Sequence, residues 1–264
     1  MKLGVIGCGK MGGALAEGII KSGACSGENT YLYDSYADAA TGLAEKTGAH
    51  VVASNAEVAQ HADAILICVK PQGLIEMLGD LDATEGKLLI SIAAGVKIAA
   101  IEKAVQNKHR VIRVMPNTPA LVGKGASAFA KGSCATDEDA QLAMTLLESV
   151  GYASEVEESD LDAVTALSGS GPAYVFLLIE SLVSAAIDQG LDPEVALQLA
   201  SQTVAGAAEM AQQTGESPSV LRENVTSPNG TTFAALESFR ESDFRGIVKK
   251  ALDAARDRSI ELGS

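Results

Sequence analysis

Residues 2–12 read Lys-Leu-Gly-Val-Ile-Gly-Cys-Gly-Lys-Met-Gly, a short apolar run followed at once by the motif Gly7-Cys8-Gly9-Lys10-Met11-Gly12. The run predicts a buried strand, and the motif matches G-x-G-x-x-G between that strand and a helix. In such a motif the first glycine makes the tight turn, the second admits a pyrophosphate, and the third lets helix and strand pack closely. The stretch therefore predicts a dinucleotide-binding α/β domain.

The next ~150 residues alternate short apolar runs with helical stretches, which is typical of a doubly wound parallel sheet. We expect strands at Lys2–Ile6, Thr30–Tyr33, His50–Val52, Ala64–Val69, Lys87–Ile92, Arg110–Met115, Ala126–Ala130 and Ala153–Val156, and a helix at Asp137–Val150. Residues 64–69 and 88–90 are apolar on both faces, as central parallel strands must be.

Strand patterns disappear after about residue 159. Asp192, Pro193 and Glu194 supply a helix cap, a first-turn proline and an early acid, which predicts a helix to about Gln213. A charged helix is expected at Ser242–Leu262.

The segment Pro172–Gln189 is apolar around most of its helical circumference, apart from a narrow stripe of Glu180, Ser184 and Asp188. A helix this apolar must be buried on several sides. We expect a partner subunit to cover it, and the alternative is the central helix of a monomeric bundle. The fold class is therefore α/β, with a Rossmann-type doubly wound sheet in residues 1–158 and an all-α dimerisation domain in residues 159–264.

Composition argues against several classes of protein. A net charge of −14 does not suit nucleic-acid phosphates. No apolar run approaches the roughly 20 residues of a membrane helix, and the N-terminus leaves no room for the apolar core of a signal peptide. Cys8, Cys25, Cys68 and Cys134 form no CxxC pair and have no neighbouring His, so neither disulfides nor a metal site are expected. We expect a cytoplasmic protein that binds no nucleic acid and no membrane.

Loops at the carboxyl ends of the predicted strands are further candidates for cofactor contact, because open α/β sheets bind ligands there. Asp34 ends the second strand, where a carboxylate holds a ribose 2′-hydroxyl; its alternative role is a helix cap. The other candidate loops are Val69-Lys70-Pro71, Ala93-Ala94-Gly95 and Met115-Pro116-Asn117-Thr118-Pro119, whose small and proline-fixed residues suit close approach by a nicotinamide ribose. Lys70 could instead be only a surface charge.

A second motif, Val225-Thr226-Ser227-Pro228-Asn229-Gly230-Thr231-Thr232, precedes an amphipathic helix expected at Phe233–Phe239. Thr231 or Thr232 could cap that helix, and the Pro-Asn-Gly turn would leave backbone N–H groups pointing out of its start. Such a start binds carboxylates, and threonine hydroxyls add donors or acceptors. Alone, the motif could also be an ordinary turn and helix cap. Combined with a cofactor domain, a small-anion pocket is typical of an oxidoreductase.

Together these motifs resemble the pyrroline-5-carboxylate reductase family over nearly the whole chain. The resemblance rests on Gly7–Gly12, Cys68–Pro71, Ser91–Val96, Arg113–Pro119, Leu167–Tyr174 and Val225–Thr232, in that order and spacing. It implies NAD(P)H-dependent reduction of the cyclic imine L-1-pyrroline-5-carboxylate to L-proline, the last step of proline biosynthesis. It also implies an intertwined homodimer, which some members build into larger rings.

The resemblance assigns roles to single residues. It implies a substrate site of Ser227, Asn229, Gly230, Thr231 and Thr232, whose backbone N–H groups hold the carboxylate, with the Thr232 hydroxyl at the ring nitrogen as the catalytic group. Ser35 and Asn55 match positions at the adenosine ribose. The full cofactor-binding set is Gly7, Cys8, Gly9, Lys10, Met11, Gly12, Asp34, Ser35, Asn55, Val69, Lys70, Pro71, Ala93, Ala94, Gly95, Met115 and Asn117. Asn229 departs from the family's frequent Gly, and a left-handed turn tolerates Asn.

Two alternative functions stay open at this point. A β-hydroxyacid dehydrogenase would share the layout, but that family places a catalytic Lys four residues beyond the second glycine of a G-x-G, where this chain has Val175. A nucleotide-sensing regulator would use the Rossmann domain as a switch. His50, His61 and His109 form no triad arrangement, and no HExxH or GxSxG motif is present.

The choice of cofactor depends on opposing features. Asp34 would repel a 2′-phosphate and favours NADH. Ser35 could donate to that phosphate, and resemblance to a biosynthetic family favours NADPH. We expect both cofactors to bind, with NADPH as the working reductant.

Overall fold

The computed structural model describes residues 1–81 and 83–263. Its internal contacts divide the chain into two compact units. Unit 1 comprises Met1–Ser170 together with the chain end from Ala255, and unit 2 comprises Gly171–Ala254. The domain boundary at residue 158 stays a prediction.

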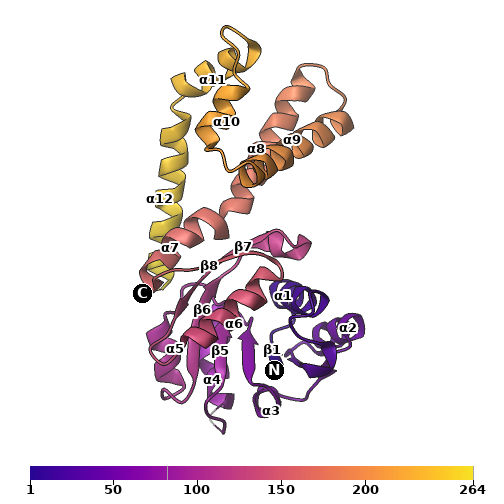
Figure 1. The fold of residues 1–264 in the computed structure, drawn as a ribbon, viewed down its shortest axis with the longest axis vertical. Coiled ribbons are helices and arrows are strands. Elements are labelled where there is room, and N and C mark those ends of the chain that lie inside the picture. The colour runs from indigo at the N-terminus through magenta and orange to yellow at the C-terminus, as the bar shows by residue number, and fades with distance from the viewer. Residues whose placement is uncertain (82, 264) are drawn as a thin grey trace. The chain divides into compact units, whose positions relative to one another are not determined.

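Unit 1 is built on one eight-stranded sheet in the order β3-β2-β1-β4-β5-β6-β7-β8 (Figure 1). Its strands are β1 (Leu3–Ile6), β2 (Thr30–Tyr33), β3 (His50–Val51), β4 (Ala64–Ile67), β5 (Leu88–Ser91), β6 (Arg110–Met115), β7 (Gly125–Lys131) and β8 (Gly151–Glu155). The prediction of a doubly wound sheet is confirmed. Neighbouring strands pair in parallel except β6 and β7, which are antiparallel. Only a short turn, Thr118–Val122, lies between these two, and a parallel return would need a longer crossover.

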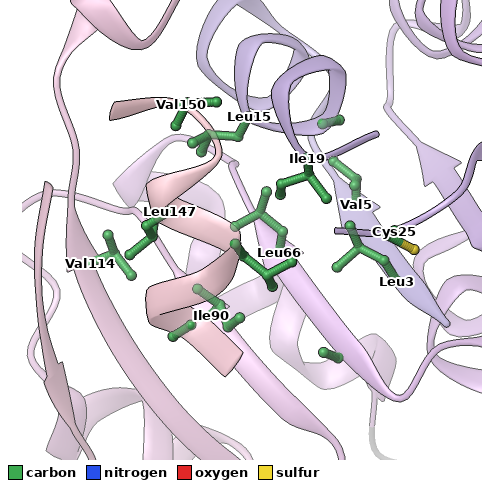
Figure 2. Close-up of a cluster of buried hydrophobic side chains, with 14 of the residues drawn as sticks. Leu3, Val5, Leu15, Ile19, Cys25, Leu66, Ile90, Val114, Leu147 and Val150 are labelled. Carbon is green, nitrogen blue, oxygen red and sulfur yellow. The ribbon is translucent and has the colours of Figure 1, made fainter. Parts of the chain in front are cut away.

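Helices cover both faces of this sheet. They are α1 (Lys10–Lys21), α2 (Ala37–Thr47), α3 (Asn55–His61), α4 (Pro71–Leu78), α5 (Ile98–Ala104), α6 (Asp137–Glu148) and the short α7 (Leu161–Val164). Side chains of α1, α2 and α6 form one buried cluster with the strands (Figure 2), and those of α3, α4 and α5 form a second. Within β1, Leu3 and Val5 belong to the first cluster and Ile6 to the second. This alternation follows from the two-residue period of a strand. Because helices cover both faces, the carboxyl ends of the parallel strands are left for ligands.

Unit 2 contains only helices within its described residues. They are α8 (Gly171–Asp188), α9 (Pro193–Gln213), α10 (Pro218–Asn224), α11 (Thr231–Glu241) and the first part of α12 (Phe244–Leu262). The predicted cap at Asp192 is confirmed, since its carboxylate accepts from the N–H groups of Glu194 and Val195 at 2.9 and 3.3 Å. The predicted helix start at Ser242 is wrong: Asp243 has φ 50°, a left-handed break, so α12 begins at Phe244.

Unit 2 buries almost none of its own apolar surface. Among residues 171–254, Ala196 and Ala200 are the two that are buried, and α8 contains none. Phe176 and Leu177 on α8 are 61% and 63% exposed. A central helix of a monomeric bundle would be buried, so that alternative is not supported, whereas uncovered apolar side chains fit the expected partner subunit.

The 31-residue helical stretch Glu158–Asp188 contains an 18-residue window with a mean hydropathy of 1.5, and it is long and apolar enough, by length and composition, to cross a membrane. The same test is passed by core helices of soluble proteins, so the stretch alone does not decide between the two.

Candidate active site

The glycine motif has the geometry that its sequence predicts. Gly7 has φ 95°, and a side chain there would come within 2.8 Å of the Cys68 carbonyl group. A Cβ on Gly12 would lie 1.9 Å from the Gly7 carbonyl oxygen, which fixes glycine at the helix–strand contact. At Gly9 a Cβ would meet nothing within 4 Å. There is thus no room for a side chain at Gly7 or Gly12, whereas the space beside Gly9 is open. This fits the pyrophosphate of a dinucleotide at the start of α1.

Asp34 ties the glycine loop to the end of β2. Its Oδ2 accepts from the backbone N–H of Cys8 at 2.6 Å, and its Oδ1 accepts from that of Tyr36 at 2.8 Å. Each carboxylate oxygen keeps a second lone pair for a further donor. Asp34 does not cap α2, because the N-cap of that helix is Tyr36 and no side chain bonds its first turn. The two backbone bonds instead hold the Asp34 carboxylate at the end of β2, where the ribose contact is predicted.

Asn55 opens α3 at the neighbouring strand end, since β2 and β3 pair in parallel. Its Nδ2 donates to Asp80 Oδ2 at 2.8 Å, which fixes the orientation of the amide. Its Oδ1 is buried and has no partner within the described chain. A buried acceptor without a partner needs a donor, and the hydroxyl of a bound ribose would supply one, as predicted for Asn55. Ser35, the other predicted ribose contact, is exposed.

Asp80 is a participant that sequence analysis missed. It lies 25 residues beyond Asn55, in a single 3₁₀ turn after α4, and carries no motif. Only the folded contact between that turn and α3 could reveal it.

The loops after β4 and β5 lie at the same edge of the sheet as Asp34. Lys70 is exposed and precedes α4, and Pro71 occupies the first turn of that helix. Val69 is half-buried between Lys70 and β4. In the loop after β5, Gly95 has φ 78°. The structure therefore brings the predicted loops to one edge, while their contact with a cofactor stays a prediction.

One thiol, Cys8, lies within the glycine motif, and a second, Cys68, lies beside Gly7 and Gly12. Burial, with a smaller contribution from the Asp34 charge, raises the pKa of Cys8 to about 12. Burial, together with Cys8, also raises the pKa of Cys68 above its usual range. Both thiols are therefore neutral at physiological pH, and neither places a negative charge beside the predicted pyrophosphate site.

Asn117 and Met115 hold the loop after β6. Asn117 is buried, its Nδ2 donates to the Ser168 carbonyl at 3.0 Å, and its Oδ1 accepts from the Ala126 N–H at 2.8 Å. Both ends of this amide are thus used within the protein, which leaves its backbone for any cofactor contact. Met115 packs against Gly169, where a Cβ would lie 2.4 Å from the Met115 methyl carbon.

A groove of about 910 Å³ begins at Cys8, Gly9 and Lys10 and follows α1 between α2 and the turn Thr118–Val122. None of the loops after β4 and β5 lines it. The groove therefore adjoins the glycine motif without being the predicted cofactor site.

The second motif forms a tight turn before α11. The N–H of Gly230 donates to the Ser227 carbonyl at 3.0 Å, and Asn229 has φ 58°. Proline followed by a left-handed residue is typical of a type II turn, so the structure confirms that Asn is tolerated at 229. A side chain on Gly230 would come within 2.3 Å of Ser227 Oγ.

The expectation that Thr231 or Thr232 caps α11 is wrong. Gly230 is the N-cap, with φ −81° and ψ 178°, and no side chain caps the helix. The extended conformation needed at the cap occurs one residue earlier than expected, so both threonines already lie in the first turn.

The start of α11 presents free donors. Its first intrahelical bond runs from the Ala234 N–H to the Gly230 carbonyl at 3.1 Å, so the amides of Thr231, Thr232 and Phe233 precede it. Thr232 is half-buried and Thr231 is exposed. Within the described residues, the Thr232 hydroxyl makes no hydrogen bond to the protein. Free amides at a helix start, with one hydroxyl beside them, suit a small carboxylate, and binding of a carboxylate there stays a prediction.

A glycine-rich dinucleotide loop on a Rossmann sheet, beside an all-helical second unit, is the layout of a nicotinamide-dependent oxidoreductase. Family models agree in both parts: residues 158–262 match pyrroline-5-carboxylate reductase dimerisation, and residues 2–95 match NADP oxidoreductase coenzyme F420-dependent.

Whole-chain comparisons are more specific. The chain is 45% identical to the pyrroline-5-carboxylate reductase of Methanosarcina acetivorans, over 99% of this chain and 98% of that protein. Among solved structures it is similar to the Coxiella burnetii enzyme of the same name, at 36% identity and TM-score 0.94, covering 100% and 98% of the two chains. The Plasmodium falciparum pyrroline carboxylate reductase with NADP bound has 35% identity and TM-score 0.88, with coverage of 100% and 98%. The chain belongs to the pyrroline-5-carboxylate reductase family.

Proposed function

We propose that this chain reduces L-1-pyrroline-5-carboxylate to L-proline with NADPH or NADH, as the last step of proline biosynthesis. Family membership and the open glycine loop support binding of the nicotinamide cofactor. The observation that supports binding of the substrate is the start of α11, where three free amides and the Thr232 hydroxyl lie together. The β-hydroxyacid dehydrogenase alternative lacks its proton donor, because Val175 is a hydrocarbon side chain on α8.

The amides of Thr231, Thr232 and Phe233 bind the substrate carboxylate at the positive end of the helix dipole. This contact fixes the ring and leaves the imine nitrogen within reach of the Thr232 hydroxyl. When bound, the nicotinamide supplies a hydride to the imine carbon. Because the imine nitrogen is already protonated, the π-electron pair of its C=N⁺ bond would then move to the nitrogen, which becomes a neutral amine whose new lone pair accepts a hydrogen bond from the Thr232 hydroxyl.

The Thr232 hydrogen bond strengthens along the reaction, so its removal should lower kcat rather than only weaken binding. We expect Thr232→Ala to lower kcat/KM about 10-fold or more, in line with about 1–3 kcal/mol for a buried group left unpaired. Thr231→Ala is the matched control, because Thr231 is exposed and contributes its backbone rather than its side chain. Steady-state oxidation of NADPH with pyrroline-5-carboxylate measures both variants. Near-wild-type turnover by a folded Thr232→Ala enzyme would show that the pocket is on another residue.

The dimerisation match supports a homo-oligomer, and we propose at least a homodimer in which a second copy covers α8. We also propose a cytoplasmic enzyme that binds neither nucleic acid nor membrane, in keeping with the net charge of −14 and a small-molecule substrate.

A further inference from the structure

The end of the chain returns to the sheet of unit 1. Ser259, near the end of α12, is only 6% exposed although it is a serine on a charged helix. Its Oγ donates to Asp162 Oδ1 at 2.6 Å, across 97 positions of sequence. A buried hydroxyl with a charged acceptor makes a short, directional bond, so this contact fixes the last turn of α12 against α7.

Just beyond this bond, the backbone of the chain end touches the loop after β5. A Cβ on Gly263 would lie 2.8 Å from the Gly95 carbonyl oxygen, and a Cβ on Gly95 would lie 3.2 Å from the Leu262 carbonyl oxygen. Gly95 needs glycine for its φ of 78° as well. Gly263 has no left-handed φ, so the space beside Gly95, rather than a turn, requires glycine at 263.

The same loop is held from its other end. Glu158 Oε1 accepts from the N–H of Ile98 at 2.7 Å and from Arg113 Nη1 at 3.0 Å. Ile98 begins α5, directly after the loop, and Arg113 is buried in β6. Residues 93–97 are thus fixed at Ile98 by a hydrogen bond to Glu158, whose half-buried carboxylate also pairs with Arg113, and at Gly95 by the chain end.

We propose that the turn Ser259–Gly263 is a positioning element for the cofactor loop Ala93–Gly95, and that it sets the affinity for the nicotinamide cofactor. The proposal rests on the function given above, in which this loop lies beside the cofactor. A loop that is already ordered loses less conformational freedom when the cofactor binds, so removing the contact weakens binding. None of these terminal residues touches substrate or cofactor in this account.

The test uses full-length Gly263→Val, in which the added side chain must push the last turn away from Gly95, and Ser259→Ala, which removes the bond to Asp162. A terminal turn frays without unfolding the sheet, so both variants should fold. Gly42→Ala is the matched control: Gly42 lies within α2 of the same unit, and a Cβ there meets nothing within 4 Å. The readouts are the dissociation constant of NADPH without substrate, KM and kcat for each reactant, and amide exchange of residues 92–97.

We expect the dissociation constant and KM of NADPH to rise about 5- to 10-fold in both variants, a range close to the 10-fold that corresponds to about 1.4 kcal/mol. Exchange should become faster in residues 92–97, while KM for pyrroline-5-carboxylate, kcat at saturation and the oligomeric state stay unchanged. A merely structural contact would lower the melting temperature without moving cofactor affinity, and that result would overturn the proposal. So would unchanged exchange together with unchanged affinity. If the wild-type protein binds neither NADPH nor NADH, the proposed function itself has failed.

Discussion

Replacing Asp34 with alanine should shift the enzyme toward NADPH. In the structure this carboxylate is held by two backbone N–H groups, at 2.6 and 2.8 Å, so it cannot turn away from a ligand at the end of β2. If Asp34 makes the predicted ribose contact, its carboxylate would accept a hydrogen bond from the 2′-hydroxyl of NADH. With NADPH, the same charge would face a phosphate whose oxygens are only acceptors.

Two effects set the size of the shift. Like charges about 4 Å apart repel by roughly 1 kcal/mol in water and roughly 4 kcal/mol at an effective dielectric constant of 20, and a half-buried site lies between these limits. A lost hydrogen bond between the 2′-hydroxyl and a charged group costs NADH about 1.5–3 kcal/mol. Both effects favour NADPH in the variant, so the ratio of kcat/KM for NADPH to that for NADH should rise at least about 10-fold.

The assay compares kcat/KM for the two cofactors at saturating pyrroline-5-carboxylate, with dissociation constants measured separately. Asp34→Asn removes the charge and keeps one acceptor for the glycine loop, so it separates repulsion from loss of loop order. Asp38→Ala is the charge-matched control, because Asp38 is exposed in the first turn of α2. An unchanged ratio in Asp34→Ala would refute the reasoning, since it would mean that the carboxylate does not face the ribose.

Three other predictions concern assembly, the glycine motif and the thiols. Sedimentation at micromolar concentration should show at least a dimer of the 27.0 kDa chain, and a 27.0 kDa species would contradict the role given to α8. Gly12→Ala should fail to fold, because its Cβ would lie 1.9 Å from a carbonyl oxygen. Gly9→Ala should fold and bind NADPH at least about 10-fold more weakly. Equal circular dichroism spectra of the two variants would count against this prediction. At pH 8, iodoacetamide should label the exposed Cys134 well before Cys8 and Cys68. The pKa of Cys8 is about 12, which lowers its thiolate fraction roughly 1,000-fold relative to an ordinary thiol, and the pKa of Cys68 is raised as well. Early labelling of Cys8 in mass spectra would show that the thiol in the glycine motif is open to solvent.

The features that could be predicted from the sequence are those that depend on residues close together in the chain. These are the glycine motif, the apolar strands and the cap at Asp192. The sequence also marked Pro228 and Asn229 as a turn. The helix cap at Gly230 was missed because it depends on a backbone conformation that two adjacent threonines, both good caps, made ambiguous.

The remaining features depend on contacts between distant segments. The antiparallel pairing of β7 follows from the short connection after β6, and the pattern of apolar residues carries no direction. Asp80 and Ser259 have no periodic or motif signal, since their partners lie 25 and 97 residues away. Asp80 bonds the predicted site residue Asn55, and Ser259 bonds Asp162 in α7, so sequence alone could supply neither of these orienting contacts.

The uncovered apolar surface of α8 has a consequence for how the protein is made in a cell. A newly synthesised chain carries a 31-residue helical stretch whose length and hydropathy match those of a membrane segment. Until a second copy is available, that stretch is open to chaperones, proteases and the machinery that inserts membrane proteins. The amount of usable enzyme should therefore fall more steeply than the rate of synthesis when expression is low, because capture of single chains competes with a pairing step that depends on concentration.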